Sequence, residues 1–174
     1  MGLSLSRSLD IPALDRVDTL AQELALLQDQ GKRRIAFLGS RHLPVVSLHL
    51  VELIARSLAQ EGHSIITSGS QGVNAAVTRA VLDVDPSLLT VLLPQSLDKQ
   101  LPEIRDQLEN VIHLIEKADN DDLSLPMASS LCNQEIISRS DQLICFAFHD
   151  SETLLNSCRI AEDLGKVVSL LFFD

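Results

Sequence analysis

Short apolar runs alternate along the chain with longer stretches in which apolar residues recur every three or four positions. The runs cover residues 34–38, 63–67, 88–93, 111–115, 142–148 and 167–173. Runs of this length, bounded by Gly, Pro or polar residues, predict strands of a buried parallel sheet. The helical spacing predicts helices at about 44–61, 74–83, 102–109, 129–138 and 153–164. The alternation predicts an α/β fold with a single doubly wound, mostly parallel sheet of Rossmann-like type.

An extra N-terminal helix is predicted ahead of the first strand. It begins near Pro12 and ends near Gly31, because proline is favoured in the first turn of a helix and glycine at its end. Its apolar stripe predicts that this helix docks on the body of the protein, and the stripe consists of Leu14, Val17, Leu20, Leu24 and Leu27. We therefore divide the chain into a tail and docking helix, residues 1–32, and a Rossmann-like domain, residues 33–174.

Composition narrows the class of ligand. A chain of 174 residues suits one domain with a full core. The formal net charge of −10 argues against a surface that attracts nucleic acid as a whole, but it leaves room for a small cationic pocket. The sequence has no Trp or Tyr, so aromatic stacking platforms for single strands are poorly supplied.

Several classes of site and location are not expected. The three cysteines lack the spacing of a zinc site, so we expect no metal, and no motif calls for a cofactor. Cys145 sits inside an apolar run and is expected to be a small core residue. No apolar run approaches the ~20 residues of a membrane span, and the first ten residues do not form a signal peptide. We expect a cytoplasmic protein.

Polar residues that could bind a ligand follow the first predicted strand. That strand ends at Gly39, and Ser40 and Arg41 come directly after it. Ligands of parallel sheets bind beyond the carboxyl ends of the strands. Gly39 would let a ligand approach the backbone, Ser40 offers a hydroxyl, and the planar guanidinium of Arg41 suits a phosphate.

Other strand ends add hydroxyls and glycines to the same edge of the sheet. The residues are Ser68, Gly69, Ser70, Gly72 and Asn74 after the second strand, and Ser151 and Thr153 after the fifth. Helix N-termini follow these strands and present free N–H groups. The chemistry favoured is phosphate or nucleotide binding. The G-x-G-x-x-G fingerprint and the P-loop motif are both absent, which disfavours NAD and P-loop hydrolysis.

Structural roles compete with ligand binding at each position. Gly69 and Gly72 could equally shape a tight strand-to-helix turn, and Arg41 could pair with a surface acid. Ser151 and Thr153 fit helix N-caps better than nucleophiles. A catalytic dyad of His149 and Asp150 is disfavoured because adjacent side chains at a strand end point apart, and His42 and His63 are expected to face solvent. No catalytic residue is assigned.

The order of these pieces resembles the DNA-processing protein A family (DprA, also called Smf), a branch of the SLOG Rossmann-like superfamily. Residues 39–41 match the family's G-S-R, and residues 68–74 resemble its S-G-x-x-x-G-[IV]-D with one residue fewer and Asn in place of Asp. Residues 101–103 are similar to part of Y-P-x-x-N, and 132–141 to R-N-R-I-I-A-x-L-S-D. Residues 151–166 are similar to S-G-S-x-x-T-A followed by A-x-x-x-G-[RK].

The resemblance implies binding of single-stranded DNA in the crevice and loading of a recombinase. It implies ligand contacts from Arg41, Ser68, Gly69, Asn133 and Ser151. The two arginines of R-N-R are Cys132 and Gln134 here, and the glycine of S-G-S is Glu152, so binding of a nucleotide or short single strand is expected to be weak. A recombinase partner follows from the resemblance, and a homodimer from the family's habit together with the apolar last strand.

Three functions stay open at this point. The leading one is a DprA-like module that binds single-stranded DNA or a nucleotide and mediates DNA processing and recombination. The second is a degenerate SLOG-fold scaffold that has lost its ligand. The third, an N-glycoside hydrolase like the cytokinin-activating (LOG) branch, is disfavoured because residues 149–153 lack the glycines of P-G-G-x-G-T-x-x-E. We therefore favour a binding protein over an enzyme.

Overall fold

The computed structural model describes residues 31–148 and 151–173. Its sheet has six strands in the order β4-β3-β2-β1-β5-β6, and every neighbouring pair is parallel. The strands are β1 (Arg34–Gly39), β2 (Ser64–Ser68), β3 (Leu89–Leu92), β4 (His113–Ile115), β5 (Gln142–Phe148) and β6 (Val167–Phe173). The chain builds outward from β1 to β4 and then returns to place β5 on the other side of β1. The strand order therefore reverses between β1 and β5.

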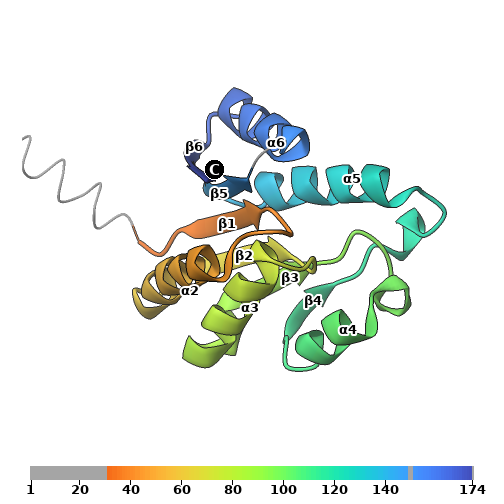
Figure 1. Cartoon of the computed structure of the whole chain (residues 1–174), viewed down its shortest axis with the longest axis horizontal. Coiled ribbons are helices and arrows are strands. Elements are labelled where there is room, and N and C mark those ends of the chain that lie inside the picture. The colour runs from red at the N-terminus through yellow and green to blue at the C-terminus, as the bar shows by residue number, and fades with distance from the viewer. Residues whose placement is uncertain (1–30, 149–150, 174) are drawn as a thin grey trace, which may run out of the picture. The chain divides into compact units, whose positions relative to one another are not determined.

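Helices connect the strands and cover both faces of the sheet (Figure 1). They are α2 (Val45–Gln60), α3 (Val73–Val84), α4 (Pro102–Leu108), α5 (Leu125–Ser138) and α6 (Glu152–Asp163). In Figure 1, α2 and α3 lie on one side of the sheet, and α5 and α6 lie on the other. The predicted doubly wound, Rossmann-like α/β fold is therefore confirmed, with a fully parallel sheet.

Element boundaries differ from the predictions in one informative place. Helix α5 begins at Leu125 instead of Ser129, because Pro126 occupies its first turn, where a missing N–H costs nothing. The predicted N-terminal helix and the dyad of His149 and Asp150 lie outside the described residues. The domain boundary at residue 32 stays a prediction. In the described part of the chain, no helix is both long and apolar enough to cross a membrane.

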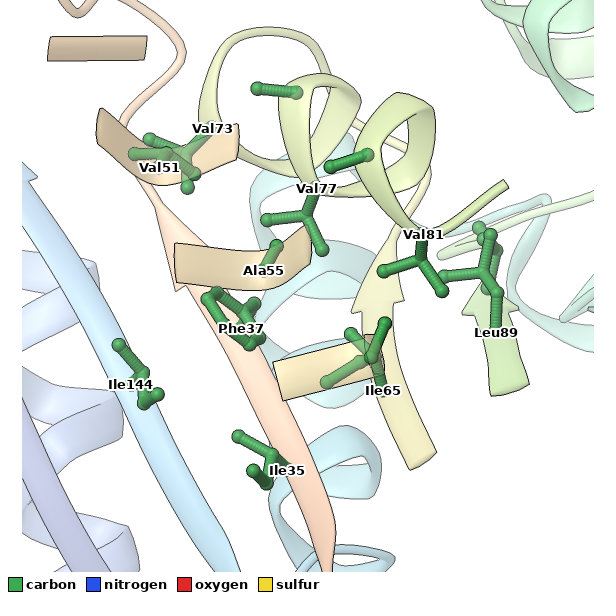
Figure 2. Close-up of a cluster of buried hydrophobic side chains, with 14 of the residues drawn as sticks. Ile35, Phe37, Val51, Ala55, Ile65, Val73, Val77, Val81, Leu89 and Ile144 are labelled. Atoms are coloured by element: carbon green, nitrogen blue, oxygen red, sulfur yellow. The ribbon is translucent and has the colours of Figure 1, made fainter. Parts of the chain in front are cut away.

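The core is formed by alternate residues of the central strands. Ile35 and Phe37 of β1 face α2 and α3, and Figure 2 shows Phe37 beside Ala55 of α2. Ala36 and Leu38 of β1 face α5 and α6 instead. Successive side chains of a strand point to opposite faces of the sheet, and helices cover both faces here. The central strands are therefore continuous hydrophobic runs. Two hydrophobic cores thus pack against the opposite faces of β1 and its neighbours. This packing fixes where the carboxyl ends of those strands lie.

Two side-chain predictions have definite outcomes. Cys145 is fully buried among the residues that face α5 and α6, as predicted. His63 was expected to face solvent, and that prediction is wrong, because its side chain is only 19% exposed. Its Nδ1 accepts a hydrogen bond of 3.0 Å from the backbone N–H of Arg33, since the starts of β1 and β2 lie side by side.

Candidate functional site

A cavity of about 800 Å³ lies at the carboxyl ends of the central strands. Its volume falls within the range of small-molecule sites, and it surrounds the reversal in strand order between β1 and β5, where open α/β sheets bind ligands. The residues that line it are Leu38, Gly39, Ser40, Arg41, His42, Ser68, Ser70, Gln71, Asn74, Pro94, Gln95, Lys99, Gln100, Leu101, Ile104, Leu125, Pro126, Ser129, Cys132, Asn133, Ser151, Glu152, Thr153 and Leu154.

Arg41 is an exposed cation on the rim of this cavity. It forms no ion pair within residues 31–148 and 151–173, so none of the described acids occupies its guanidinium. Beside it, the Ser40 hydroxyl oxygen accepts a hydrogen bond of 3.2 Å from the His42 backbone N–H. The Ser40 hydroxyl proton stays available to a ligand, and His42 is exposed as predicted. Guanidinium and hydroxyl together form a donor pair suited to a phosphate.

Ser68, Ser70 and Asn74 form a hydrogen-bonded triangle beneath the rim. The Asn74 amide Nδ2 donates to both serine hydroxyl oxygens at 2.6 Å, and the two hydroxyls lie 2.7 Å apart. The three groups carry four polar hydrogens and make three bonds, so one hydroxyl hydrogen is left over. Ser70 is the partly exposed member, whereas Asn74 is only 3% exposed and its Oδ1 has no described partner. When Ser68 donates to Ser70, the spare hydrogen belongs to the Ser70 hydroxyl, which lines the cavity.

Four helices contribute residues of their first turns to the cavity: α3, α4, α5 and α6. In each, no side chain caps the N-terminus. The first N–H groups of these helices therefore keep hydrogen-bonding capacity, and each helix end carries a partial positive charge. At α3 one of these groups is used, because the Val73 N–H donates to the Ser40 carbonyl oxygen at 3.1 Å.

Two residues in the lining limit the chemistry. Glu152, the first residue of α6, is exposed and brings a negative charge to that helix N-terminus, where it competes with an anionic ligand. Cys132 lies on α5, and burial raises the pKa of its thiol to about 12. Its sulfur contacts the Leu92 carbonyl oxygen at 3.6 Å. The thiol therefore stays protonated at neutral pH and is not an activated nucleophile.

Gly69 and Gly72 are needed for packing of the protein on itself. Neither lines the cavity, whereas the other predicted ligand residues do. A Cβ on Gly69 would meet a side-chain carbon of Leu93 at 2.2 Å, and one on Gly72 would meet the carbonyl oxygens of Ser40 and Arg41 at 2.5 Å. The tight strand-to-helix turn accounts for Gly72, whose φ is +73°, whereas Gly69 packs against the side chain of Leu93 and its part in ligand binding stays a prediction.

The remaining predicted residues arrive from α5 and α6. Asn133 is partly exposed on α5, and Thr153 is exposed in the first turn of α6. Ser151 occupies the N-cap position of α6, but its Oγ donates to the Phe148 carbonyl oxygen at 2.8 Å instead of capping the helix. No described group of three or more His, Cys, Asp or Glu side chains could hold a metal ion.

Sequence reasoning missed one wall of the cavity. Gln95 lies just beyond β3 and is not among the predicted site residues. Its side-chain Nε2 lies 3.1 to 3.4 Å from three carbonyl oxygens, those of Asn120, Asp121 and Leu123, which share its two hydrogens. Leu101 and Leu125 complete the wall with exposed aliphatic side chains. A search for polar chemistry at strand ends could not find apolar residues that lie several positions beyond those ends.

Comparisons with known proteins show similarity of structure and no match by sequence. No protein-family model matches the sequence, and no curated protein matches it either. DNA processing protein A from Helicobacter pylori, which is described by its single-stranded DNA binding mode, superposes with a TM-score of 0.67 and 23% identity, covering 81% of this chain and 66% of its own.

Two further structures are similar. A protein called TM1055 superposes with a TM-score of 0.55 and 18% identity, covering 78% of this chain and 72% of its own. DNA processing protein A from Streptococcus pneumoniae superposes with a TM-score of 0.51 and 17% identity, covering 84% of this chain and 60% of its own. The chain therefore has a DprA-like Rossmann fold, and it spans about two thirds of the length of the Helicobacter protein.

Proposed function

We propose that this protein is a DprA-like module that binds the phosphate of single-stranded DNA or of a nucleotide at the carboxyl edge of its sheet. The module would act in DNA processing and recombination. The observation that carries the proposal is Arg41, an exposed cation without a described ion pair on the rim of a cavity of about 800 Å³. A cation left open beside a ligand-sized cavity is suited to binding an anion from solution.

The surroundings of Arg41 support a phosphate as that anion. Ser40 and Ser70 add hydroxyl donors, and the N-terminus of α3 adds a partial positive charge. The fold supports a nucleic-acid ligand, because the Helicobacter protein that shares it binds single-stranded DNA. Few cations line the cavity, since Arg41 is accompanied by Lys99, whose Nζ already donates to the Asp121 carbonyl oxygen at 3.2 Å. Binding should therefore be weak.

Removal of the guanidinium tests the proposal. We expect Arg41→Ala to weaken binding of a nucleoside monophosphate or a short deoxythymidine strand by at least ~10-fold, because a charge-assisted hydrogen bond contributes ~1.5–3 kcal/mol. Affinity would be measured by isothermal titration calorimetry at low salt. Arg159→Ala is the matched control, because it removes the same charge from an exposed residue of α6 outside the cavity lining. Equal affinities for Arg41→Ala and wild type would contradict the proposal.

The scaffold without a ligand is the competing outcome. A ligand that prefers the native state must raise the melting temperature, by an amount that grows with its concentration. A panel of nucleotides and oligonucleotides at saturating concentration that leaves the melting temperature of the wild type unchanged would favour the scaffold. The recombinase partner implied by the sequence resemblance would then have to dock without nucleic acid.

A further inference from the structure

The cavity has two chemically different sides, and their order follows from the sheet. Arg41 and Ser40 follow β1, and Ser70 follows β2. Leu101 lies beyond β3 and Leu125 beyond β4. Neighbouring strands are ~4.8 Å apart, so the loops after β1 and β3 are separated by roughly 10 Å. The loop after β1 therefore brings an open cation and a hydroxyl to the cavity, whereas the loops after β3 and β4 bring exposed leucines together with Lys99, whose ammonium already donates to the Asp121 carbonyl oxygen.

The aliphatic side is open to solvent. Leu101 is 54% exposed and Leu125 is 45% exposed, although both line the cavity. Exposed leucines that converge on a cavity bury apolar area only when a ligand covers them. A bare phosphate or a sugar phosphate would leave this side uncovered, whereas a planar base would cover it.

Gln95 adds a fixed acceptor to the same side. Its Nε2 faces three backbone carbonyl oxygens, and a flipped amide would place Oε1 against these acceptors with no hydrogen between them, so the orientation of the amide is fixed. The residue is only 7% exposed, and its Oε1 has no hydrogen-bond partner in the described part of the chain. An amide oxygen of fixed orientation that has no protein donor, in a residue that lines the cavity, suits the N–H group of a ligand.

We propose that the cavity holds a single nucleotide unit, with its phosphate at Arg41 and its base against Leu101 and Leu125, where a donor on the base edge reaches Gln95. The proposal deepens the function proposed above and rests on it. It replaces aromatic stacking, for which the cavity lining has no Phe, by aliphatic contact on the base. The nucleotide can be free or can be the phosphorylated end of a single strand.

The test compares ligands with and without a base by isothermal titration calorimetry. We expect at least one nucleoside 5′-monophosphate to bind ten times more tightly than ribose 5-phosphate. In the double variant Leu101→Ser, Leu125→Ser this ratio should fall below three, with ribose 5-phosphate unaffected. The matched control is Met127→Ser, Leu131→Ser, because both residues are exposed on α5 and neither lines the cavity. The control should keep the full ratio.

The role of Gln95 is tested with the protein unchanged. The best-bound nucleotide should lose at least threefold in affinity when its base edge lacks the hydrogen-bond donor, as when purine riboside 5′-monophosphate replaces AMP. An unchanged affinity would overturn that contact. A 5′-phosphorylated trinucleotide that matches the mononucleotide identifies a strand end as the ligand, and one that binds more weakly identifies a free nucleotide; both results support a site for one unit.

Two different failures can be told apart. The base-binding side would be overturned if ribose 5-phosphate binds as tightly as every mononucleotide. It would also be overturned if the Leu101→Ser, Leu125→Ser variant and its control lose the preference for mononucleotides equally. Either result leaves the phosphate site intact. The phosphate site would be overturned as well if no ligand binds the wild type, or if Arg41→Ala binds the ligands as tightly as the wild type does.

Discussion

At the scale of single residues, Gly72 holds two loops of the site together. Its φ of +73° is a conformation that glycine adopts freely, and its missing Cβ gives room to the carbonyl oxygens of Ser40 and Arg41. We expect Gly72→Ala to lower the free energy of unfolding by about 3 kcal/mol, because it adds a steric clash to the backbone strain. Urea denaturation would measure the loss.

Gly165 supplies the control for backbone strain alone. Its φ is +72°, yet a Cβ there would meet no atom within 4 Å. Gly165→Ala should therefore cost only about 1 kcal/mol. If the two variants are destabilised equally, the close approach to the loop after β1 contributes nothing.

Glu152 is a second residue whose replacement separates two effects. Its carboxylate lies at the N-terminus of α6, in the lining of the cavity, where it repels an anionic ligand. We expect Glu152→Gln to raise the affinity for a nucleoside monophosphate about two- to fivefold at low salt. Glu162→Gln, an exposed change on the same helix outside the cavity lining, removes the same charge and should leave the affinity nearly unchanged. A gain in both variants would show a general charge effect.

At the scale of elements, an ion pair joins the start of β1 to the start of β5. Arg34 and Asp141 pair at 2.9 Å, and the Asp141 carboxylate also accepts the Arg34 backbone N–H at 3.0 Å. The hydrogen bond from the Arg34 side chain is the main cause that lowers the pKa of Asp141 below its ordinary value of 3.8. The pair therefore contributes stability above that pH, which is lost as the pH falls through the lower, folded-state pKa.

We predict the effect of this pair on acid unfolding. Asp141→Asn should cost no more than about 1 kcal/mol at pH 7, because both side chains are half exposed. Below pH 4, its stability should fall less steeply with pH than that of the wild type. Melting temperatures measured from pH 7 to pH 2 would show this. Arg34→Gln should flatten the same part of the curve, and a steep curve in both variants would contradict the assignment.

The sequence predicts the elements of this fold well for a physical reason. The strand at 142–148 has the predicted bounds because a parallel strand buried on both faces is a continuous apolar run. The edge strand at 167–173 also has the predicted bounds, since its run is equally apolar although it is only partly buried. The start of α5 was misplaced because residues 125–128 carry no helical apolar stripe, and its sign was Pro126 in the first turn. Propensity and periodicity act locally, so they show elements but place their ends less well.

The candidate site was predictable only in its polar half. Arg41 and Ser70 each lie two residues beyond a strand end, and Asn74 lies in the first turn of the helix that follows β2. The topology of a parallel sheet brings such residues together. The packing roles of Gly69 and Gly72 could not be predicted, because the atoms that they approach are distant in the sequence or belong to another loop.

At the scale of the whole molecule, the edge of the sheet bears on assembly. Strand β6 is an edge strand, and it exposes Val167, Leu170 and Phe172 by 43 to 57%. The homodimer inferred from the sequence stays a prediction, and an exposed apolar edge strand is a surface that it could use. We expect wild type to sediment as a dimer at micromolar concentration and Phe172→Lys to sediment as a monomer. A monomeric wild type would remove the prediction, and His113→Lys on the opposite edge is the control.

The open guanidinium of Arg41 lies on a molecule whose formal charge is −10. Each nucleotide added to a bound strand brings a further phosphate past the cavity mouth, toward a body that repels it, with no second open guanidinium to meet it among the cavity residues. Proteins that coat single strands gain affinity with every nucleotide that they cover. Here a longer strand should bind no more tightly than a short one, so the amount of protein bound to DNA should depend on the number of strand ends and not on strand length.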